Sequence, residues 1–201
     1  MSDDILIRAQ KLPTASISDV MDILGINGVM SGISRRSGTG RIAGYARTID
    51  CIVGQFGSYE PADFSVFPLF NAAEKSTVLI FNLGGAEVST FGGVAASTLA
   101  RRDVAGAIID GACRDIEQLK SSGLSVASRH ITPRSGKGRM KVTSQGIPIQ
   151  CGGVLVNDGD LIVLDDTGVV VIPASEIQSV LAKAEALEKG DKNHLSAIGS
   201  K

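Results

Sequence analysis

Residues 106–115, with the sequence GAIIDGACRD, decide the fold and mark the first candidate site. The apolar start of this stretch predicts a buried strand, which leads into a turn of small residues. The turn ends in Arg114 and Asp115, a guanidinium beside a carboxylate. A guanidinium can bind a carboxylate through two parallel hydrogen bonds, and a carboxylate oxygen can bind a hard divalent metal. Where a strand gives way to a helix, such a pair commonly faces a crevice.

Strands and helices alternate on both sides of this stretch. The predicted elements are a strand at 76–81, a helix at 91–102, a strand at 107–110, a helix from 115 to 119 that ends near Gly123, and a strand at 125–128. Three strands separated by helices within about 50 residues are typical of a right-handed parallel βαβαβ unit. The sequence therefore predicts an α/β fold built around a parallel sheet.

The flanking segments complete a single domain that covers residues 1–201. Before the parallel unit, we expect a helix at 16–25, capped by Ser16 and stopped by Gly25, and then a strand at 42–49. After it, turns separate short strands at 141–143, 147–149, 154–156, 161–164 and 169–172, which predict a β-rich second layer. A helix at about 174–189 and a polar tail at 190–201 follow.

Composition narrows the class of protein. The 20 basic and 21 acidic residues are spread along the chain and form no basic block, so we do not expect a nucleic-acid partner. The three cysteines (Cys51, Cys113 and Cys151) lie far apart without CxxC spacing, as expected of reduced thiols. No apolar run approaches the roughly 18 residues of a membrane span, and the first residues carry acids where a signal peptide is basic. We therefore expect a cytoplasmic protein with no membrane partner.

Arg114 and Asp115 have two interpretations on spacing alone. In the first, they form a carboxylate-binding and metal-binding pair. In the second, Asp115 is the N-cap of the following helix, Gln118 completes a capping box, and Arg114 is an ordinary exposed arginine.

The second candidate is the glycine-rich helix opening that begins at Phe91. Two glycines, Gly92 and Gly93, allow an anion to approach free backbone N–H groups, and the helix dipole adds to the attraction. The alternative is a glycine hinge that serves tight packing only. In a βαβ unit this helix start lies at the same sheet edge as Arg114, so the two could hold a small carboxylate together.

Other polar residues carry weaker signals. His130 follows a strand and is more typical of a structural histidine than of a ligand, and His194 lies in the polar tail. Without a His/Cys cluster, oxygen-ligated Mg²⁺ or Mn²⁺ fits better than a transition metal. The acidic turns at 158–160 and 165–166 lack EF-hand spacing, so we interpret them as solvated turns.

The motifs resemble a known family. GAIIDGACRD, the glycine-opened helix before it, and CGGVLVNDGDLIVLDDTGVVVIP at 151–173 are similar to the 4-hydroxy-4-methyl-2-oxoglutarate aldolases. That family also contains the regulators of ribonuclease activity and proteins once labelled demethylmenaquinone methyltransferases. The resemblance covers about residues 16–189. It implies a swivelling-type α/β/β sandwich that assembles as a homotrimer or homohexamer with sites between subunits.

The resemblance also implies roles for individual residues. Arg114 would bind the pyruvyl part of the substrate, and Asp115 would carry the divalent metal. The substrate loop, whose backbone amides hold the carboxylate, maps to Gly92, Gly93, Val94 and Ala95.

The chain departs from the aldolase pattern at two positions. Gly93 stands where that pattern has an acid that orders the metal's water shell. The glutamate that the family takes from a neighbour's C-terminal helix has no clear match around 189–191. Glu87 and Asp191 are the candidate replacements.

Together these features predict a class II lyase that depends on Mg²⁺ or Mn²⁺ and cleaves a small 2-oxo acid through a pyruvate enolate. Retro-aldol cleavage and oxaloacetate decarboxylation share that enolate. The alternative is a non-catalytic regulator that binds a protein partner such as a ribonuclease.

Overall fold

A computed structural model describes residues 3–198, with side chains described through residue 190. The helices are α1 (Asp3–Lys11), α2 (Thr14–Ile23), η1 (Pro61–Asp63, a 3-10 helix), α3 (Phe67–Ala72), α4 (Gly93–Ala100), α5 (Ile116–Ser122) and α6 (Ile177–Ile198). The strands are β1 (Ser34–Ser37), β2 (Ile42–Val53), β3 (Thr77–Asn82), β4 (Ser89–Phe91), β5 (Gly106–Cys113), β6 (Ser125–Ile131), β7 (Met140–Gln145), β8 (Ile149–Cys151), β9 (Val154–Val156), β10 (Leu161–Leu164) and β11 (Val169–Ile172).

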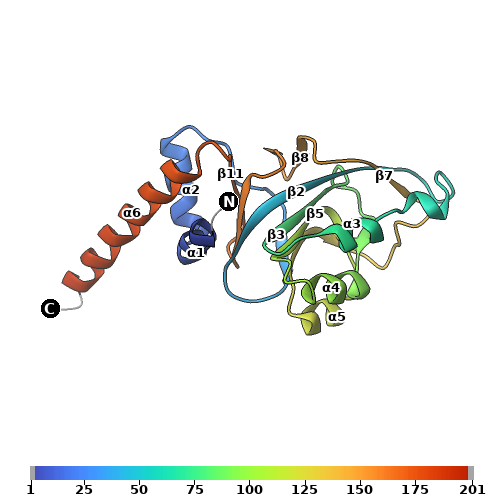
Figure 1. Cartoon of the computed structure of the whole chain (residues 1–201), viewed down its shortest axis with the longest axis horizontal. Helices are drawn as coiled ribbons and strands as arrows, with labels where there is room; N and C mark the ends of the chain where they lie inside the picture. Colours follow the sequence, from blue (N-terminus) through green and yellow to red (C-terminus); the bar gives the residue numbers. More distant parts are fainter. Residues whose placement is uncertain (1–2, 199–201) are drawn as a thin grey trace.

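The centre of the molecule is the predicted parallel βαβαβ unit, formed by β3, α4, β5, α5 and β6 (Figure 1). β5 lies between β3 and β6 and pairs parallel with both. All eight residues of β5 are buried, because helices cover one face of the sheet and a hairpin covers the other. A strand buried on both faces reads as a nearly continuous apolar run, so this unit was predictable from the sequence.

The β-rich second half is also confirmed. β7 and β10 pair antiparallel with different parts of the long strand β2, and β11 pairs with β10. These strands extend the central sheet into a curled mixed sheet of nine strands. β8 and β9 form a separate two-stranded sheet whose buried residues pack against β3 and β5.

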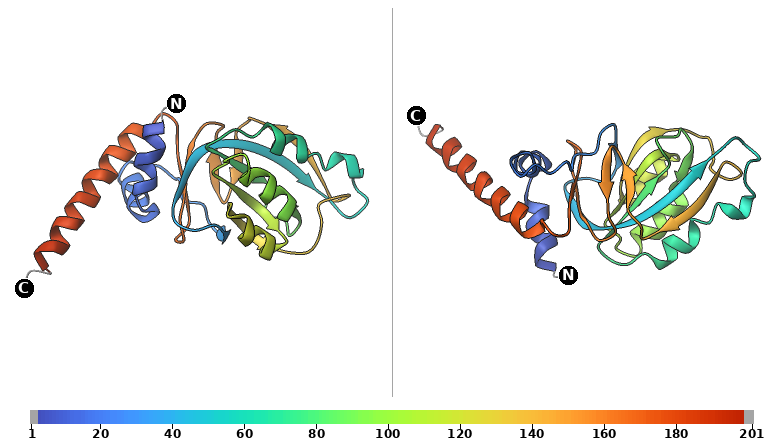
Figure 2. Two further views of the ribbon diagram at one scale, coloured as in Figure 1. Left: turned by 60° about the horizontal axis from the view of Figure 1, so that its bottom comes forward. Right: turned by 90° about the horizontal axis from the view of Figure 1, so that it is seen from above.

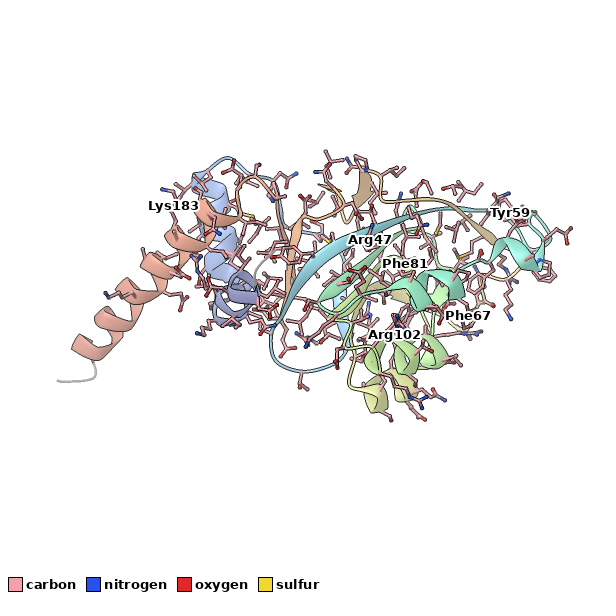
Figure 3. All side chains as sticks on the ribbon, viewed as in Figure 1. Arg47, Tyr59, Phe67, Phe81, Arg102 and Lys183 are labelled. Carbon is pink, nitrogen blue, oxygen red and sulfur yellow. The ribbon has the colours of Figure 1, made fainter. Side chains whose placement is uncertain are left out.

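The helices form two groups, one on a face of the central sheet and one against β10 and β11 (Figures 1 and 2). α3, α4 and α5 cover one face of the sheet over a core that includes three buried phenylalanines: Phe70, Phe81 and Phe91. Figure 3 labels Phe81 in the body of the molecule and Phe67 at the start of α3. α1, α2 and α6 instead pack on β10 and β11 through a separate apolar cluster, and α6 projects away from the sheet (Figure 2).

Several predicted boundaries differ from the structure. α2 begins at Thr14 after Pro13 with no side-chain cap, so the prediction of a Ser16 cap was wrong. β8 covers 149–151 instead of 147–149, in line with the missing N–H of Pro148. α6 runs to Ile198, past the predicted end at 189, because a single glycine costs a helix only about 1 kcal/mol.

One further property concerns membranes. Among residues 3–198, no helix combines the length and the apolar character that crossing a membrane requires.

Candidate functional site

Arg114 and Asp115 lie at the carboxyl end of β5, as predicted. The short strand β4 was not predicted; it pairs with the end of β5 and brings the start of α4 beside this turn. The backbone N–H of Arg114 donates to the carbonyl of Phe91 at 2.9 Å. Arg114 Nε is 3.7 Å from Asp115 Oδ2, and each side chain is 42% exposed. The pair therefore remains in reach of a dissolved ligand.

Asp115 adopts an unusual backbone conformation. Its φ of 56° and ψ of 47° place it in the left-handed region, which non-glycine residues seldom occupy. It stands at the N-cap position of α5, but its side chain makes no capping hydrogen bond there. The capping box with Gln118 was therefore wrong. Asp115 Oδ2 instead accepts the backbone N–H of Gly93 at 3.2 Å, so the carboxylate lies at the N-terminus of the neighbouring helix α4.

The two glycines at the start of α4 allow this close approach. A Cβ on Gly92 would lie 2.6 Å from Asp115 Oδ2 and 3.1 Å from Arg114 Cγ. A Cβ on Gly93 would lie 2.6 Å from Gln118 Cβ, a separation that real side chains essentially never show. Gln118 thus occupies the space into which a side chain at position 93 would project. Tight packing accounts for both glycines, and substrate binding by the amides of residues 92–95 stays a prediction.

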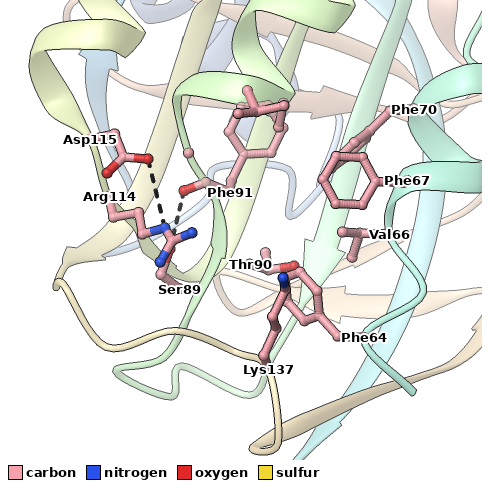
Figure 4. A pocket seen from close by; sticks show the side chains of 13 residues that line it. Phe64, Val66, Phe67, Phe70, Ser89, Thr90, Phe91, Arg114, Asp115 and Lys137 are labelled. Carbon is pink, nitrogen blue, oxygen red and sulfur yellow. Dashed lines mark hydrogen bonds and ion pairs between the residues drawn. The ribbon is translucent and has the colours of Figure 1, made fainter. Parts of the chain in front are cut away.

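A cavity of about 200 Å³ opens beside this turn (Figure 4). One part of its lining is polar and comes from the Arg114–Asp115 turn and the start of α4. The rest comes from β4, from the segment around α3 and from a loop before β7. The lining residues are Phe64, Val66, Phe67, Phe70, Ser89, Thr90, Phe91, Gly92, Val94, Ala95, Arg114, Asp115 and Lys137.

The donor set at this cavity suits one kind of metal. Asp115 is the only carboxylate in the lining, and among the described side chains no cluster of three His, Cys, Asp or Glu could hold a metal. Zinc and similar metals are commonly bound by three or four such side chains. Mg²⁺ keeps most of its waters and binds proteins through one or two carboxylates plus substrate oxygens. An exposed Asp115 with one protein hydrogen bond fits that second pattern.

The other candidate residues lie away from the cavity or have structural roles. His130 is half-buried, and its Nε2 is 3.1 Å from the carbonyl oxygen of Gly85, in line with a structural histidine. Glu87 is exposed and does not line the cavity. The side chains of Asp191 and His194 lie outside the described residues.

The cysteines are three separate buried thiols, as predicted. Burial raises the pKa of Cys51 to about 12, and it also raises the pKa of Cys113 and of Cys151. A thiol must ionise to act as a nucleophile or metal ligand. These side chains therefore serve the core.

The acidic turns are more than solvated loops. Asp160 is buried and accepts the backbone N–H groups of Asn157 and Ala174. Asp165 accepts hydrogen bonds from Thr14, Thr167 and Arg41. Burial raises the pKa of Asp165, but these hydrogen bonds outweigh burial and hold its pKa below the ordinary value. The prediction of solvated turns was wrong for these two residues.

Sequence reasoning also missed a buried ion pair. Asp110 lies within β5, 6% exposed, and its Oδ1 is 2.6 Å from Arg129 Nε on β6. Its Oδ2 accepts the backbone N–H of Gly152 at 2.7 Å, which joins the sheet to the β8–β9 hairpin. The available signal was a charged residue inside an otherwise apolar strand, because such residues are rarely buried unless paired.

The fold and this site define an α/β protein with an exposed carboxylate–guanidinium pair at the edge of a parallel sheet. A family model described as "RraA-like: Aldolase/RraA" matches residues 14–171. The chain therefore belongs to the aldolase/RraA family.

Individual relatives agree with this assignment. The "Putative 4-hydroxy-4-methyl-2-oxoglutarate aldolase" of Halalkalibacterium halodurans is 29% identical over 196 residues, which cover 97% of this chain and 89% of that protein. Protein DlpA of Legionella pneumophila is 31% identical over 194 residues; these cover 93% of this chain but only 30% of that longer protein.

A solved structure shares the whole fold. It is RraAS2 of Streptomyces coelicolor, described as an unusual member of the RNase ES inhibitor RraA protein family. The TM-score is 0.86 at 23% identity, over 96% of each chain. At this identity the likeness supports the α/β fold.

Proposed function

We propose that this protein is a divalent-metal-dependent lyase that releases pyruvate from a small 2-oxo acid. The observation that carries the proposal is the Asp115 carboxylate. It is 42% exposed, stands beside a guanidinium, and accepts a single hydrogen bond from the described residues, that of the Gly93 N–H. Strained backbone at an exposed polar residue often marks a functional site. The aldolase name of the Halalkalibacterium relative supports the same reaction class.

Asp115 would hold Mg²⁺ or Mn²⁺. When bound, the metal would supply Lewis-acid stabilisation of negative charge on the 2-oxo oxygen. Arg114 would donate hydrogen bonds to the pyruvyl oxygens, where negative charge grows as the C–C bond breaks. Gly92, the N-cap of α4, supplies no side-chain cap, and Asp115 accepts the N–H of Gly93, so the next amides, those of Val94 and Ala95, would orient the substrate carboxylate.

The bond changes are those of a retro-aldol or a decarboxylation. In the first, the C3–C4 bond breaks, the 4-hydroxyl proton passes to water, and C4 leaves as a carbonyl. In the second, the same bond of oxaloacetate breaks and C4 leaves as CO₂. In both, the electron pair stays on the pyruvate enolate, which then takes a proton at C3.

The test is pyruvate release from 4-hydroxy-4-methyl-2-oxoglutarate and from oxaloacetate. Turnover should require Mg²⁺ or Mn²⁺, stop with EDTA, and be lost in Asp115→Ala. The matched control is Asp158→Ala, because Asp158 bonds to Arg47 and Thr48 outside the cavity. Absence of metal-dependent turnover, or turnover that Asp115→Ala leaves unchanged, would contradict the proposal.

The proposal includes an assembly. We expect a homotrimer or homohexamer with sites between subunits, and the projecting helix α6 supports this by leaving surface for a second copy (Figure 2). Sedimentation equilibrium should give three or six chains per particle. A monomer at all concentrations would contradict it.

A second candidate function is regulation of a ribonuclease. It is favoured by the shared fold with RraAS2, whose family is named for RNase ES inhibition. Addition of the protein to a ribonuclease E-type enzyme should then slow RNA cleavage, and Asp115→Ala should not change the inhibition. The two functions therefore differ in their response to one substitution.

A further inference from the structure

The far wall of the cavity is aromatic. Phe70 and Phe91 are each 1% exposed, with ring centroids 5.6 Å apart and ring planes at 75°. Phe67 packs edge-on against Phe70 at 5.8 Å and 78°. Edge-to-face aromatic contacts of this kind are favourable and directional. Phe70 and Phe91 therefore hold Phe67 in place from behind, and Phe67, 46% exposed, is the ring of this set that a ligand can contact.

The rest of this half of the cavity offers few charges. Phe64 and Val66 add apolar surface, and Figure 4 draws them across the cavity from Arg114. Among the described residues, Lys137 is the only other cation in the lining; it is exposed, and Figure 4 draws it on the same side of the cavity as Phe64. The lining also carries two hydroxyl groups, and both are neutral. Ser89 Oγ donates to the carbonyl of Phe91, and Thr90 Oγ1 is buried without a partner among the described residues.

The polar and the aromatic parts of the cavity favour different chemical groups of a substrate. A second carboxylate placed against Phe64 and Phe67 would lose hydration, and the cation that it meets in the lining, Lys137, is exposed, where an ion pair contributes little. A hydrocarbon group there would instead contact the exposed part of Phe67 and the half-buried Phe64. An apolar cavity of about 150 Å³ is enough to bind benzene, so about 200 Å³ leaves room for a ring and part of a short chain.

We infer that the substrate is a 2-oxo acid whose C4 carries an apolar group, such as a phenyl ring, in place of a second carboxylate. This inference rests on the proposed function, because Arg114 and the α4 amides bind the 2-oxo acid end. For a 4-aryl-4-hydroxy-2-oxobutanoate, the C3–C4 bond breaks and the 4-hydroxyl loses its proton to water. The products are an aromatic aldehyde and the pyruvate enolate, which takes a proton at C3.

The kinetic test compares two substrates that differ only at C4. These are 4-hydroxy-2-oxo-4-phenylbutanoate and 4-hydroxy-2-oxoglutarate, each supplied with Mg²⁺. The phenyl compound should have the higher kcat/KM, by tenfold or more. Phe67→Ala should reduce that ratio at least fivefold, whereas Phe56→Ala should not change it, because Phe56 is 74% exposed outside the cavity. A preference for the dicarboxylate, above all one lost in Lys137→Met, would overturn the inference.

A binding measurement separates this inference from the proposed function. Phenylpyruvate and oxaloacetate are titrated calorimetrically into the wild-type protein and Phe67→Ala with Mg²⁺ present. Tighter binding of phenylpyruvate, weakened in Phe67→Ala, supports the inference even if neither C4 substrate is cleaved. Binding and cleavage of oxaloacetate without a preference for the ring overturn the inference alone. No binding of either 2-oxo acid overturns both proposals.

Discussion

Asp115 and Asp165 occupy similar places in the sequence, since each stands in the turn after a buried strand, but they differ in what surrounds them. Asp165 is 13% exposed, and both of its oxygens accept hydrogen bonds from the protein. Asp115 is 42% exposed and, within the described part of the chain, accepts a single N–H. One carboxylate is saturated by the fold, and the other has room for a ligand.

The comparison teaches that the residue type and its turn do not identify a site. The number of hydrogen bonds that a carboxylate already accepts is the better guide, because a saturated carboxylate has few lone pairs left for a metal. Asp165 receives bonds from Thr14, far away along the chain, and so fastens α2 to β10. Asp115 bonds to α4 through Oδ2, and no described residue donates a hydrogen bond to its other oxygen.

The largest expected effect is the loss of activity when Asp115 loses its charge. Asp115→Asn keeps the size of the side chain and removes the charge that a metal needs. We expect kcat/KM for pyruvate release to fall about 10³-fold or more, since a Lewis acid supplies several kcal/mol. Steady-state kinetics at saturating Mg²⁺ measures this. Asp165→Asn is the matched control, and an equal loss of activity in both variants would remove the distinction between them.

The second prediction concerns Asp110, a buried carboxylate whose two oxygens both have protein partners. Asp110→Asn leaves the partly buried Arg129 without its counter-ion. We expect unfolding free energy to fall by about 3–5 kcal/mol, as for other broken buried pairs. Urea unfolding followed by circular dichroism gives the value. A change below 1 kcal/mol would show that the pair contributes little to stability.

The third prediction concerns the packing that holds Asp115 in place. Gly93→Asp introduces a Cβ that clashes with Gln118, so we expect a loss of about 1–3 kcal/mol in unfolding free energy. Gln118→Ala should not relieve the full clash, because its Cβ remains, but Gln118→Gly should restore part of the loss. Thermal unfolding of the single and double variants measures the coupling. Simple additivity of the two substitutions would contradict this account.

The smallest effect is a pH dependence at Asp165. Its pKa is lowered in the folded protein, so its stabilising contribution is present above the ordinary pKa of about 3.9 and is lost as pH falls through the folded pKa. Asp165→Asn should cost about 1–2 kcal/mol at neutral pH, and the difference from wild type should shrink below about pH 4. Urea unfolding from pH 7 to pH 3 measures it. A difference that grows in acid would have the wrong sign.

The sequence predicted the sheet better than the site. β3 and β5 were predictable because each is largely a short apolar run buried on both faces. β4 was not, since three residues, Ser-Thr-Phe, carry no period and pair only with the end of β5. The acceptor roles of Asp165 and Asp115 depend on donors that are distant in the chain, Thr14 and Gly93 respectively, and no local pattern records such contacts.

Mn²⁺ binding followed by electron paramagnetic resonance tests the central claim most directly, because it reports the metal without requiring turnover. Wild type and Asp165→Asn should both bind Mn²⁺ at one site per chain, and pyruvate should tighten that binding. Asp115→Asn should lose the site. Unchanged Mn²⁺ binding in Asp115→Asn, or loss of binding in Asp165→Asn alone, would contradict the assignment of Asp115 as the metal-binding carboxylate.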